Sequence, residues 1–173
     1  MDENELGLMT DHTKRGEVVG KKCDDFTLKD HLGNNFTLSE ALSTHIVLLA
    51  FYPGGPIHPI CTGQFCEYRD TREEFDKLNV KIYGVSNDPI DKQAKFAQGN
   101  GYPFLFLQDS YNKVAKQFMC TSKFMLNRVS RAIVIINQDM ILLYRYVEPT
   151  VFTRRGSFEL INILKDLKNE GLI

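Results

Sequence analysis

The chain has 173 residues, enough for one domain with a buried core, and we expect a single domain over 1–173. Its 21 basic and 22 acidic residues give a net charge of −1, which disfavours nucleic acid and anionic membrane surfaces as partners. Four cysteines are too few for a disulfide scaffold at this length, so they are candidates for reactive thiols.

The N-terminal residues, 1–18, are polar and mix acidic with basic side chains, which predicts a flexible extension. They contain no apolar run of the length that an export signal needs, so we expect a cytoplasmic protein. The longest apolar run of the chain, Ile46 to Tyr52, has seven residues, against about 20 for a membrane span. That run is therefore expected to be a buried strand.

Three elements are expected in the first half of the chain. Alternating apolar and polar residues around a Gly/Asn turn predict a hairpin over 23–40. The unbroken apolar run over 46–52 is typical of a central strand covered on both faces, and Pro53 to Pro56 end it. Apolar residues at spacings of three and four, with a proline near the start, then predict one helix from about 60 to 78.

The second half alternates strands with helices and adds an antiparallel strand pair. The expected strands are 80–85, 104–107, 132–136 and 141–147, and the expected helices lie near 89–97, 112–119 and 157–168. We expect the inner side of the last helix to carry Phe158, Leu160, Ile161, Leu164 and Leu167. This order predicts a three-layer α/β fold with a mixed central sheet flanked by helices.

Cys61 has the sequence context of a nucleophile. It follows a central strand and a Gly/Pro loop and stands in the first turn of the expected helix. Free amide N–H groups and the positive end of the helix dipole favour the thiolate there. The carboxyl end of a strand is also where ligands bind in α/β folds.

Cys66 follows Cys61 by five residues, which in an intact helix places their Cα atoms about 8.7 Å apart. A disulfide needs less than about 7 Å between those atoms. If the two cysteines bond, the first turns of the helix must unwind, and the redox cycle includes a conformational change.

The segment around these cysteines resembles the active-site segment of peroxiredoxins, especially the bacterioferritin comigratory protein or Q-type branch. The likeness rests on Phe-Tyr-Pro after the strand, Pro59-Ile60-Cys61-Thr62, Gln64, Cys66 and Arg69-Asp70. It extends over most of the chain: the segments 20–28, 82–88 and 104–109 are similar to strands of that family, and Arg131 matches its active-site arginine. The resemblance implies a thioredoxin-like fold with an N-terminal hairpin extension.

The resemblance also implies a thiol-dependent peroxidase with an antioxidant role in redox homeostasis, acting on hydrogen peroxide or organic hydroperoxides. Cys61 would attack the peroxide and become a sulfenic acid, and Cys66 would resolve it as an intramolecular disulfide. Arg131 would hold the thiolate and stabilise the departing oxygen, with Gln64 orienting that arginine. A thioredoxin-like dithiol would regenerate the enzyme, no cofactor is implied, and the protein would be a monomer or homodimer.

One position departs from the family pattern. The family has a threonine three residues before the cysteine, whereas this chain has His58 there and one extra residue in the loop. His58 is therefore a candidate catalytic residue, as a hydrogen-bond partner, as a cation favouring the thiolate or as a proton donor. The alternatives are a structural histidine and a remodelled loop with slow or lost peroxidase activity.

Two other classes of function stay open. A metal-binding redox module similar to thioredoxin-like copper chaperones would use His58, Cys61 and Cys66 as soft ligands. Four residues between the cysteines, and an arginine at the site, disfavour it. The other class is a catalytically degenerate thioredoxin-fold domain. Cys23 and Cys120 are expected to be small buried residues of the core.

Overall fold

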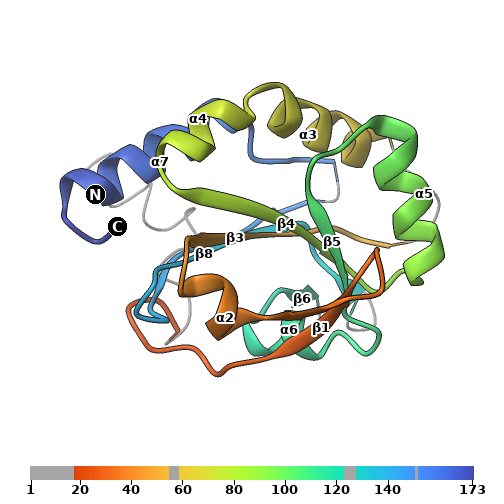
Figure 1. Cartoon of the computed structure of the whole chain (residues 1–173), viewed down its shortest axis with the longest axis horizontal. Coiled ribbons are helices and arrows are strands. Elements are labelled where there is room, and N and C mark those ends of the chain that lie inside the picture. The colour runs from red at the N-terminus through yellow and green to blue at the C-terminus, as the bar shows by residue number, and fades with distance from the viewer. Residues whose placement is uncertain (1–17, 55–58, 123–127, 151) are drawn as a thin grey trace.

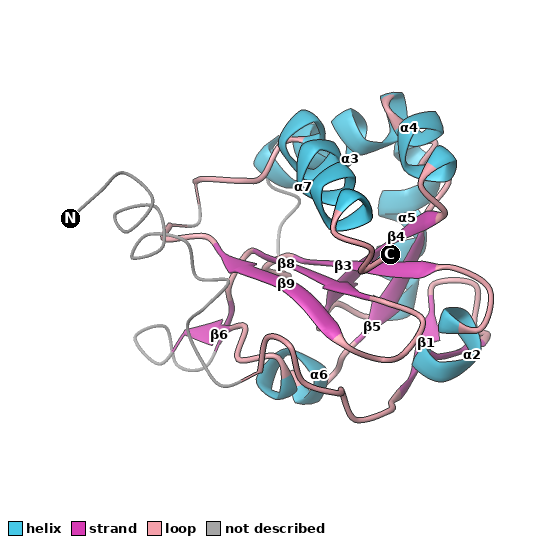
Figure 2. Cartoon of the chain, turned by 90° about the vertical axis from the view of Figure 1, so that its left-hand side faces the viewer, coloured by secondary structure: helices cyan, strands magenta, loops and turns pink. Residues whose placement is uncertain are grey.

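A computed structural model of the chain describes residues 18–54, 59–122, 128–150 and 152–173. All of the expected N-terminal extension except Val18 lies outside these ranges. Helices lie on both faces of one central sheet, so the fold has the three layers expected from the sequence (Figures 1 and 2).

The middle layer consists of β1 (Thr27–Asp30), β2 (Asn35–Thr37), β3 (Ile46–Phe51), β4 (Val80–Ser86), β5 (Leu105–Gln108), β8 (Ala132–Ile136) and β9 (Leu142–Val147). Within the described residues these strands form one sheet in the order β2-β1-β5-β4-β3-β8-β9. β4 is parallel to β3 and to β5, whereas the other neighbouring pairs are antiparallel. The mixed sheet is therefore confirmed. The N-terminal hairpin is confirmed as well, but residues 38–40 of its expected range belong to a short helix and not to its second strand.

The outer layers divide the helices between the two faces of the sheet (Figure 2). One face carries α3 (Pro59–Asp70), α4 (Arg72–Lys77), α5 (Ile90–Asn100) and α7 (Ser157–Asn169), and the other carries α2 (Leu38–Leu42) and α6 (Lys113–Gln117). Within the described ranges, no helix has the length and apolar character needed to cross a bilayer.

The core lies in two clusters, one on each face of the sheet, and β3 contributes to both. Leu48 and Ala50 belong to the cluster under α3, whereas Leu49 and Phe51 belong to the cluster under α2 and α6. All six residues of β3 are buried, because successive side chains of a central strand point to opposite, covered faces. This explains the unbroken apolar run in the sequence.

The single helix expected over 60–78 is wrong, because two helices, α3 and α4, meet at Thr71. Thr71 has a φ of −109° and a ψ of 13°, outside the helical region. Its hydroxyl donates a hydrogen bond to the carbonyl oxygen of Glu67 at 2.8 Å. Such bonding of a threonine to the preceding turn competes with the regular helical ladder and bends the helix.

The placement of Phe158 on the inner side of α7 is also wrong, because its side chain is 76% exposed. Phe158 lies about 100° around the helix from Ser157, which takes it off the buried face. Leu167, at the other border of that face, is only partly buried. The buried residues of α7 are Ser157, Leu160, Ile161 and Leu164.

Short elements are present that the sequence pattern does not indicate. α2 has five residues, too few for a helical period to show. β6 (Thr121–Ser122) and β7 (Arg128–Val129) form a separate two-stranded ladder. The remaining helices differ from expectation only at their ends; α5, for example, continues to Asn100 and is capped by Gly101 in the left-handed conformation, with a φ of 61°.

Candidate active site

Strand pairing brings Cys61 and Arg131 together although 70 residues separate them. Cys61 is the third residue of α3, the helix that follows β3 and begins at Pro59, a residue favoured at the first helical position. Arg131 directly precedes β8, whose first residue, Ala132, pairs with Phe51 at the carboxyl end of β3. Because β3 and β8 are antiparallel, the end of one strand meets the start of the other.

The Arg131 guanidinium links Cys61 to Gln64. Its Nη2 donates to Cys61 Sγ at 3.4 Å, and its Nη1 donates to Gln64 Oε1 at 2.9 Å. All three residues are buried, with at most 4% of their surface exposed. The guanidinium therefore holds a positive charge and a donor N–H beside the sulfur, at a site shielded from bulk water. The structure therefore brings together three of the residues expected at the site.

Tyr68 belongs to the same network, and sequence reasoning missed it. Gln64 Nε2 donates to the Tyr68 hydroxyl at 2.9 Å, and that hydroxyl donates to the carbonyl oxygen of Arg155 at 2.7 Å. This chain orients the Gln64 amide so that its oxygen faces Arg131. Burial raises the pKa of Tyr68 far above its ordinary value, so the hydroxyl stays neutral and keeps its proton to donate. The four-residue spacing from Gln64 was the available signal.

Cys66 lies on the same helix but in a different environment from Cys61. Its side chain is half-buried, and its Sγ lies 3.4 Å from the hydroxyl of Tyr102. Both cysteines are free thiols inside the continuous helix α3. With helical geometry their Cα atoms are too far apart for a disulfide, which needs less than about 7 Å. Bonding between them therefore requires part of α3 to unwind, as expected from the spacing.

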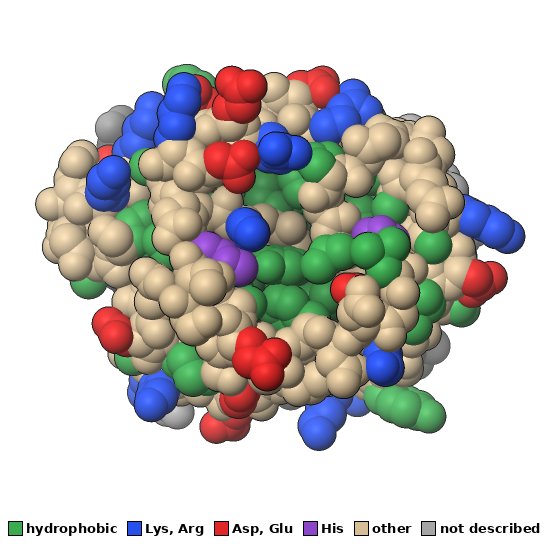
Figure 3. All heavy atoms as spheres, in the orientation of Figure 1, with side chains coloured by type: hydrophobic (Ala, Val, Ile, Leu, Met, Phe, Trp, Pro, Cys, Tyr) green, Lys and Arg blue, Asp and Glu red, His purple; other side chains and the backbone are tan. Residues whose placement is uncertain are grey.

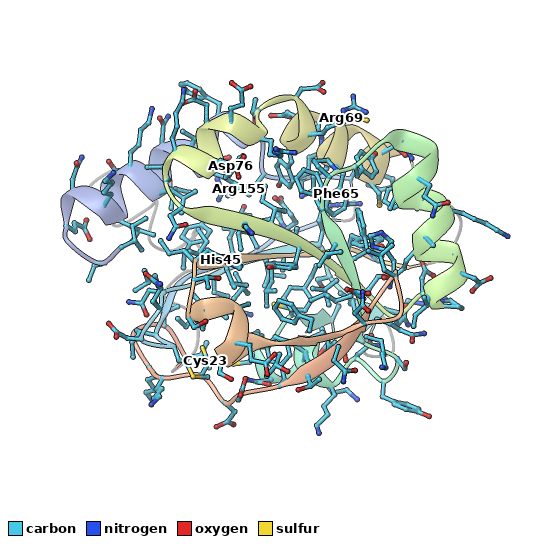
Figure 4. The ribbon with its side chains drawn as sticks, viewed as in Figure 1. Cys23, His45, Phe65, Arg69, Asp76 and Arg155 are labelled. Carbon is cyan, nitrogen blue, oxygen red and sulfur yellow. The ribbon has the colours of Figure 1, made fainter. Side chains whose placement is uncertain are left out.

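The other two cysteines have the character of core residues. Burial raises the pKa of Cys120 to about 12, and its thiol donates to the carbonyl oxygen of Phe118. Cys23 is half-buried, and burial raises its pKa to about 11. It lies on the opposite side of the sheet from α3 and Phe65 (Figure 4). The expected burial is complete for Cys120 and partial for Cys23.

We expect Cys23 and Cys120 to resist alkylation in the native protein at pH 8. The thiolate is the reactive species, and a pKa of about 11 leaves roughly one Cys23 in a thousand deprotonated at that pH. Labelling should rise with pH and approach half of its maximum only near pH 11, with Cys120 lagging behind. Peptide mapping after iodoacetamide treatment measures this, with denatured protein as the control. Native Cys120 labelled at pH 8 as fast as denatured Cys120 would contradict the prediction.

His58, a candidate from the sequence, lies outside the described residues, so its role stays a prediction. A hollow of about 300 Å³ opens between α4 and the first residues of β4 and β5. Its lining includes Arg72, Phe75 and Ile82. The face shown in Figure 3 is hollowed near its centre, where hydrophobic side chains are visible. Cys61 does not line this hollow, since it lies beyond the carboxyl end of the central strand β3.

The metal-binding alternative loses support at the site itself. Arg131 places a fixed positive charge 3.4 Å from the sulfur of Cys61, where a bound cation would be repelled. Across the part of the chain that the structure describes, no three His, Cys, Asp or Glu side chains are grouped for metal binding.

Comparison with known proteins finds similar sequences and folds. The AhpC/TSA family model matches residues 19–145. The chain is 39% identical to peroxiredoxin Bcp of Bacillus subtilis over 100 residues, which are 58% of this chain and 62% of that protein. It is 32% identical to the chloroplastic peroxiredoxin Q of Triticum aestivum over 140 residues, which are 81% of this chain and 62% of that protein. These matches favour a thiol peroxidase over the other two classes.

Solved structures agree on the fold. The crystal structure of peroxidoxin BcpB from Mycobacterium tuberculosis superposes with a TM-score of 0.76 at 29% identity, covering 89% of this chain and 98% of that chain. PrxQ of Xylella fastidiosa gives a TM-score of 0.76 at 18% identity, covering 90% and 99%, and supports the fold alone. The thioredoxin-like fold is therefore confirmed. The matched segments span 62–65% of the lengths of the curated relatives from Mycobacterium tuberculosis, Bacillus subtilis and Triticum aestivum.

Proposed function

The chain belongs to the AhpC/TSA family, and from this membership we propose that it is a peroxiredoxin that reduces hydrogen peroxide and organic hydroperoxides through its own thiols. One observation carries the proposal: the buried guanidinium of Arg131 donates to Cys61 Sγ at 3.4 Å, in the first turn of α3. The N-terminus of a helix and a guanidinium both place positive charge and N–H donors near the sulfur, and these interactions favour a nucleophilic thiolate.

The first step is attack of the Cys61 thiolate on one peroxide oxygen. The S–O bond forms while the O–O bond breaks, so sulfur is oxidised to the sulfenic acid and the second oxygen leaves as hydroxide or alkoxide and takes a proton. Negative charge moves from sulfur to the leaving oxygen during this step. The Arg131 donors face that charge, while Gln64 and Tyr68 hold the guanidinium in place.

The second step regenerates the site through Cys66. The Cys66 sulfur attacks the sulfenic sulfur of Cys61, the S–S bond forms, the S–O bond breaks and water leaves. A thioredoxin-type dithiol then reduces the disulfide and is itself oxidised. A cycle that depends on such a dithiol fits a reducing compartment, and we propose an antioxidant role in the cytoplasm.

Treatment of the reduced protein with one equivalent of hydrogen peroxide tests this cycle. We expect mass spectrometry to find a Cys61–Cys66 disulfide, and α3 to lose helicity and become sensitive to proteases near residues 60–70, because the bond cannot form in an intact helix. The matched variant Cys66→Ser should instead accumulate a sulfenic acid at Cys61, trapped with dimedone. An unmodified Cys61 after treatment would overturn the proposed function.

A further inference from the structure

The hydroxyl of Tyr102 contacts the turn of α3 that lies between the two reactive cysteines. It donates to the carbonyl oxygen of Thr62 at 3.0 Å, and it lies 3.4 Å from Cys66 Sγ. Because its single proton is given to Thr62, the Cys66 thiol is the donor in the second contact. The Tyr102 hydroxyl oxygen therefore bridges Cys66 and Thr62, and Thr62 is the residue that follows Cys61.

Tyr102 is firmly anchored outside α3. It follows Gly101, the left-handed cap of α5, and its amide N–H donates to the carbonyl oxygen of Ala97 at 3.0 Å. The residue is 8% exposed, and its ring packs against Phe65 and Phe96. The hydroxyl therefore has a fixed position, and the turn of α3 must move away from the hydroxyl when this turn unwinds.

Arg69 joins the same anchor from the helix side. Its guanidinium carbon lies 6.0 Å from the centroid of the Tyr102 ring, and its Nη1 donates to the carbonyl oxygen of Asn100 at 2.6 Å. Arg69 is the penultimate residue of α3 and lies above Phe65 in the view of Figure 4. Arg69 thus contacts the segment from Asn100 to Tyr102 and helps to hold the Tyr102 hydroxyl in place.

We propose that Tyr102 is a positioning residue that holds Cys66 in the folded helix and so limits the rate at which the disulfide forms. The proposal rests on the peroxidase function proposed above. Both contacts of the hydroxyl exist only while the turn containing Thr62 and Cys66 is helical. They stabilise the folded helix relative to the unwound one, and disulfide formation must break them.

A slower resolution step has a chemical consequence for Cys61. While Cys66 is held, the sulfenic acid of Cys61 stays exposed to a second peroxide molecule. That peroxide transfers one oxygen atom to the sulfur, which becomes a sulfinic acid, and is reduced to water or an alcohol. The Tyr102 hydroxyl therefore sets how readily the enzyme is inactivated by excess peroxide.

Tyr102→Phe removes the hydroxyl and keeps the ring, so it tests the proposal directly. In rapid-quench experiments with mass spectrometry, we expect disulfide formation to become about fivefold to tenfold faster, as for the loss of one or two hydrogen bonds. The sulfinic fraction at excess peroxide should fall by a similar factor, whereas sulfenic acid formation at Cys61 should keep its wild-type rate. Amide hydrogen exchange of residues 61–66 in the reduced protein should also become faster.

Tyr83→Phe is the matched control, because it removes a hydroxyl bonded to His45 Nε2 at 2.8 Å in the core cluster on the other face of the sheet. It should leave the rates of sulfenic acid and disulfide formation unchanged. If Tyr102→Phe does not fold, Arg69→Gln weakens the same anchor, and we expect resolution about twofold faster. Resolution at or below the wild-type rate in the folded variant overturns the inference. A wild-type protein that forms no sulfenic acid overturns the proposed function instead.

Discussion

Replacing Cys61 with serine is expected to lower the rate constant for peroxide reduction by at least about a thousandfold. A serine hydroxyl is a far weaker nucleophile than a thiolate, and its oxygen cannot be oxidised by peroxide as sulfur is when it forms a sulfenic acid. The fold should survive, because serine is close to cysteine in size and its oxygen can still accept from Arg131. Peroxide consumption coupled to dithiol oxidation measures the loss.

Cys23→Ser is the matched control for this prediction. It makes the same change of atom on the opposite side of the sheet, at a half-buried thiol whose pKa burial raises to about 11. We expect it to retain wild-type activity and to change the free energy of unfolding by less than about 1 kcal/mol. More than a few per cent of wild-type activity in Cys61→Ser would show that another group carries the reaction.

The fold was predictable wherever the chain repeats a burial pattern. β3 shows an unbroken apolar run because both of its faces are covered, and β8 shows the same run for the same reason. Periodicity failed where the backbone leaves the helical conformation at a single residue. The apolar spacing continues through Thr71, yet a φ of −109° and a ψ of 13° at that residue separate α3 from α4. The hydrogen bond from the Thr71 hydroxyl to the carbonyl oxygen of Glu67 accompanies this bend.

A residue of the candidate site was predictable where its sequence neighbours or its residue type mark it as functional. Cys61 is marked by the strand, loop and helix around it, and Arg131 by its place before an apolar strand in a sequence that resembles a known family. Tyr102 carries no such mark, and Tyr68 has only its four-residue spacing from Gln64. Tyrosines are common in cores, and the partners of these two hydroxyls, Arg155 and Thr62, are 87 and 40 residues away in the sequence.

Replacing Arg131 with methionine is expected to lower the rate constant for Cys61 oxidation by about 10²- to 10³-fold, the range for removal of one donor to developing charge. Stopped-flow measurement with hydrogen peroxide tests this. Arg131→Lys keeps the charge, but one ammonium cannot reproduce the fork that donates to Cys61 Sγ and Gln64 Oε1 together, so we expect about a tenfold loss. Methionine also leaves buried Gln64 Oε1 without this donor, which should lower the free energy of unfolding by about 1–3 kcal/mol.

Alkylation of Cys61 separates the two roles proposed for Arg131. Iodoacetamide reacts with the same thiolate as the peroxide does, but its leaving group is iodide and no charge develops on an oxygen. If Arg131 acts only by favouring the thiolate, the methionine variant loses both reactions by the same factor. We expect peroxide reduction to fall at least about tenfold more than alkylation, because the guanidinium also faces the departing oxygen. Equal losses of the two rates would show that Arg131 only favours the thiolate and does not stabilise the leaving oxygen. An unchanged rate of peroxide reduction in the methionine variant would show that Arg131 takes no part in the reaction.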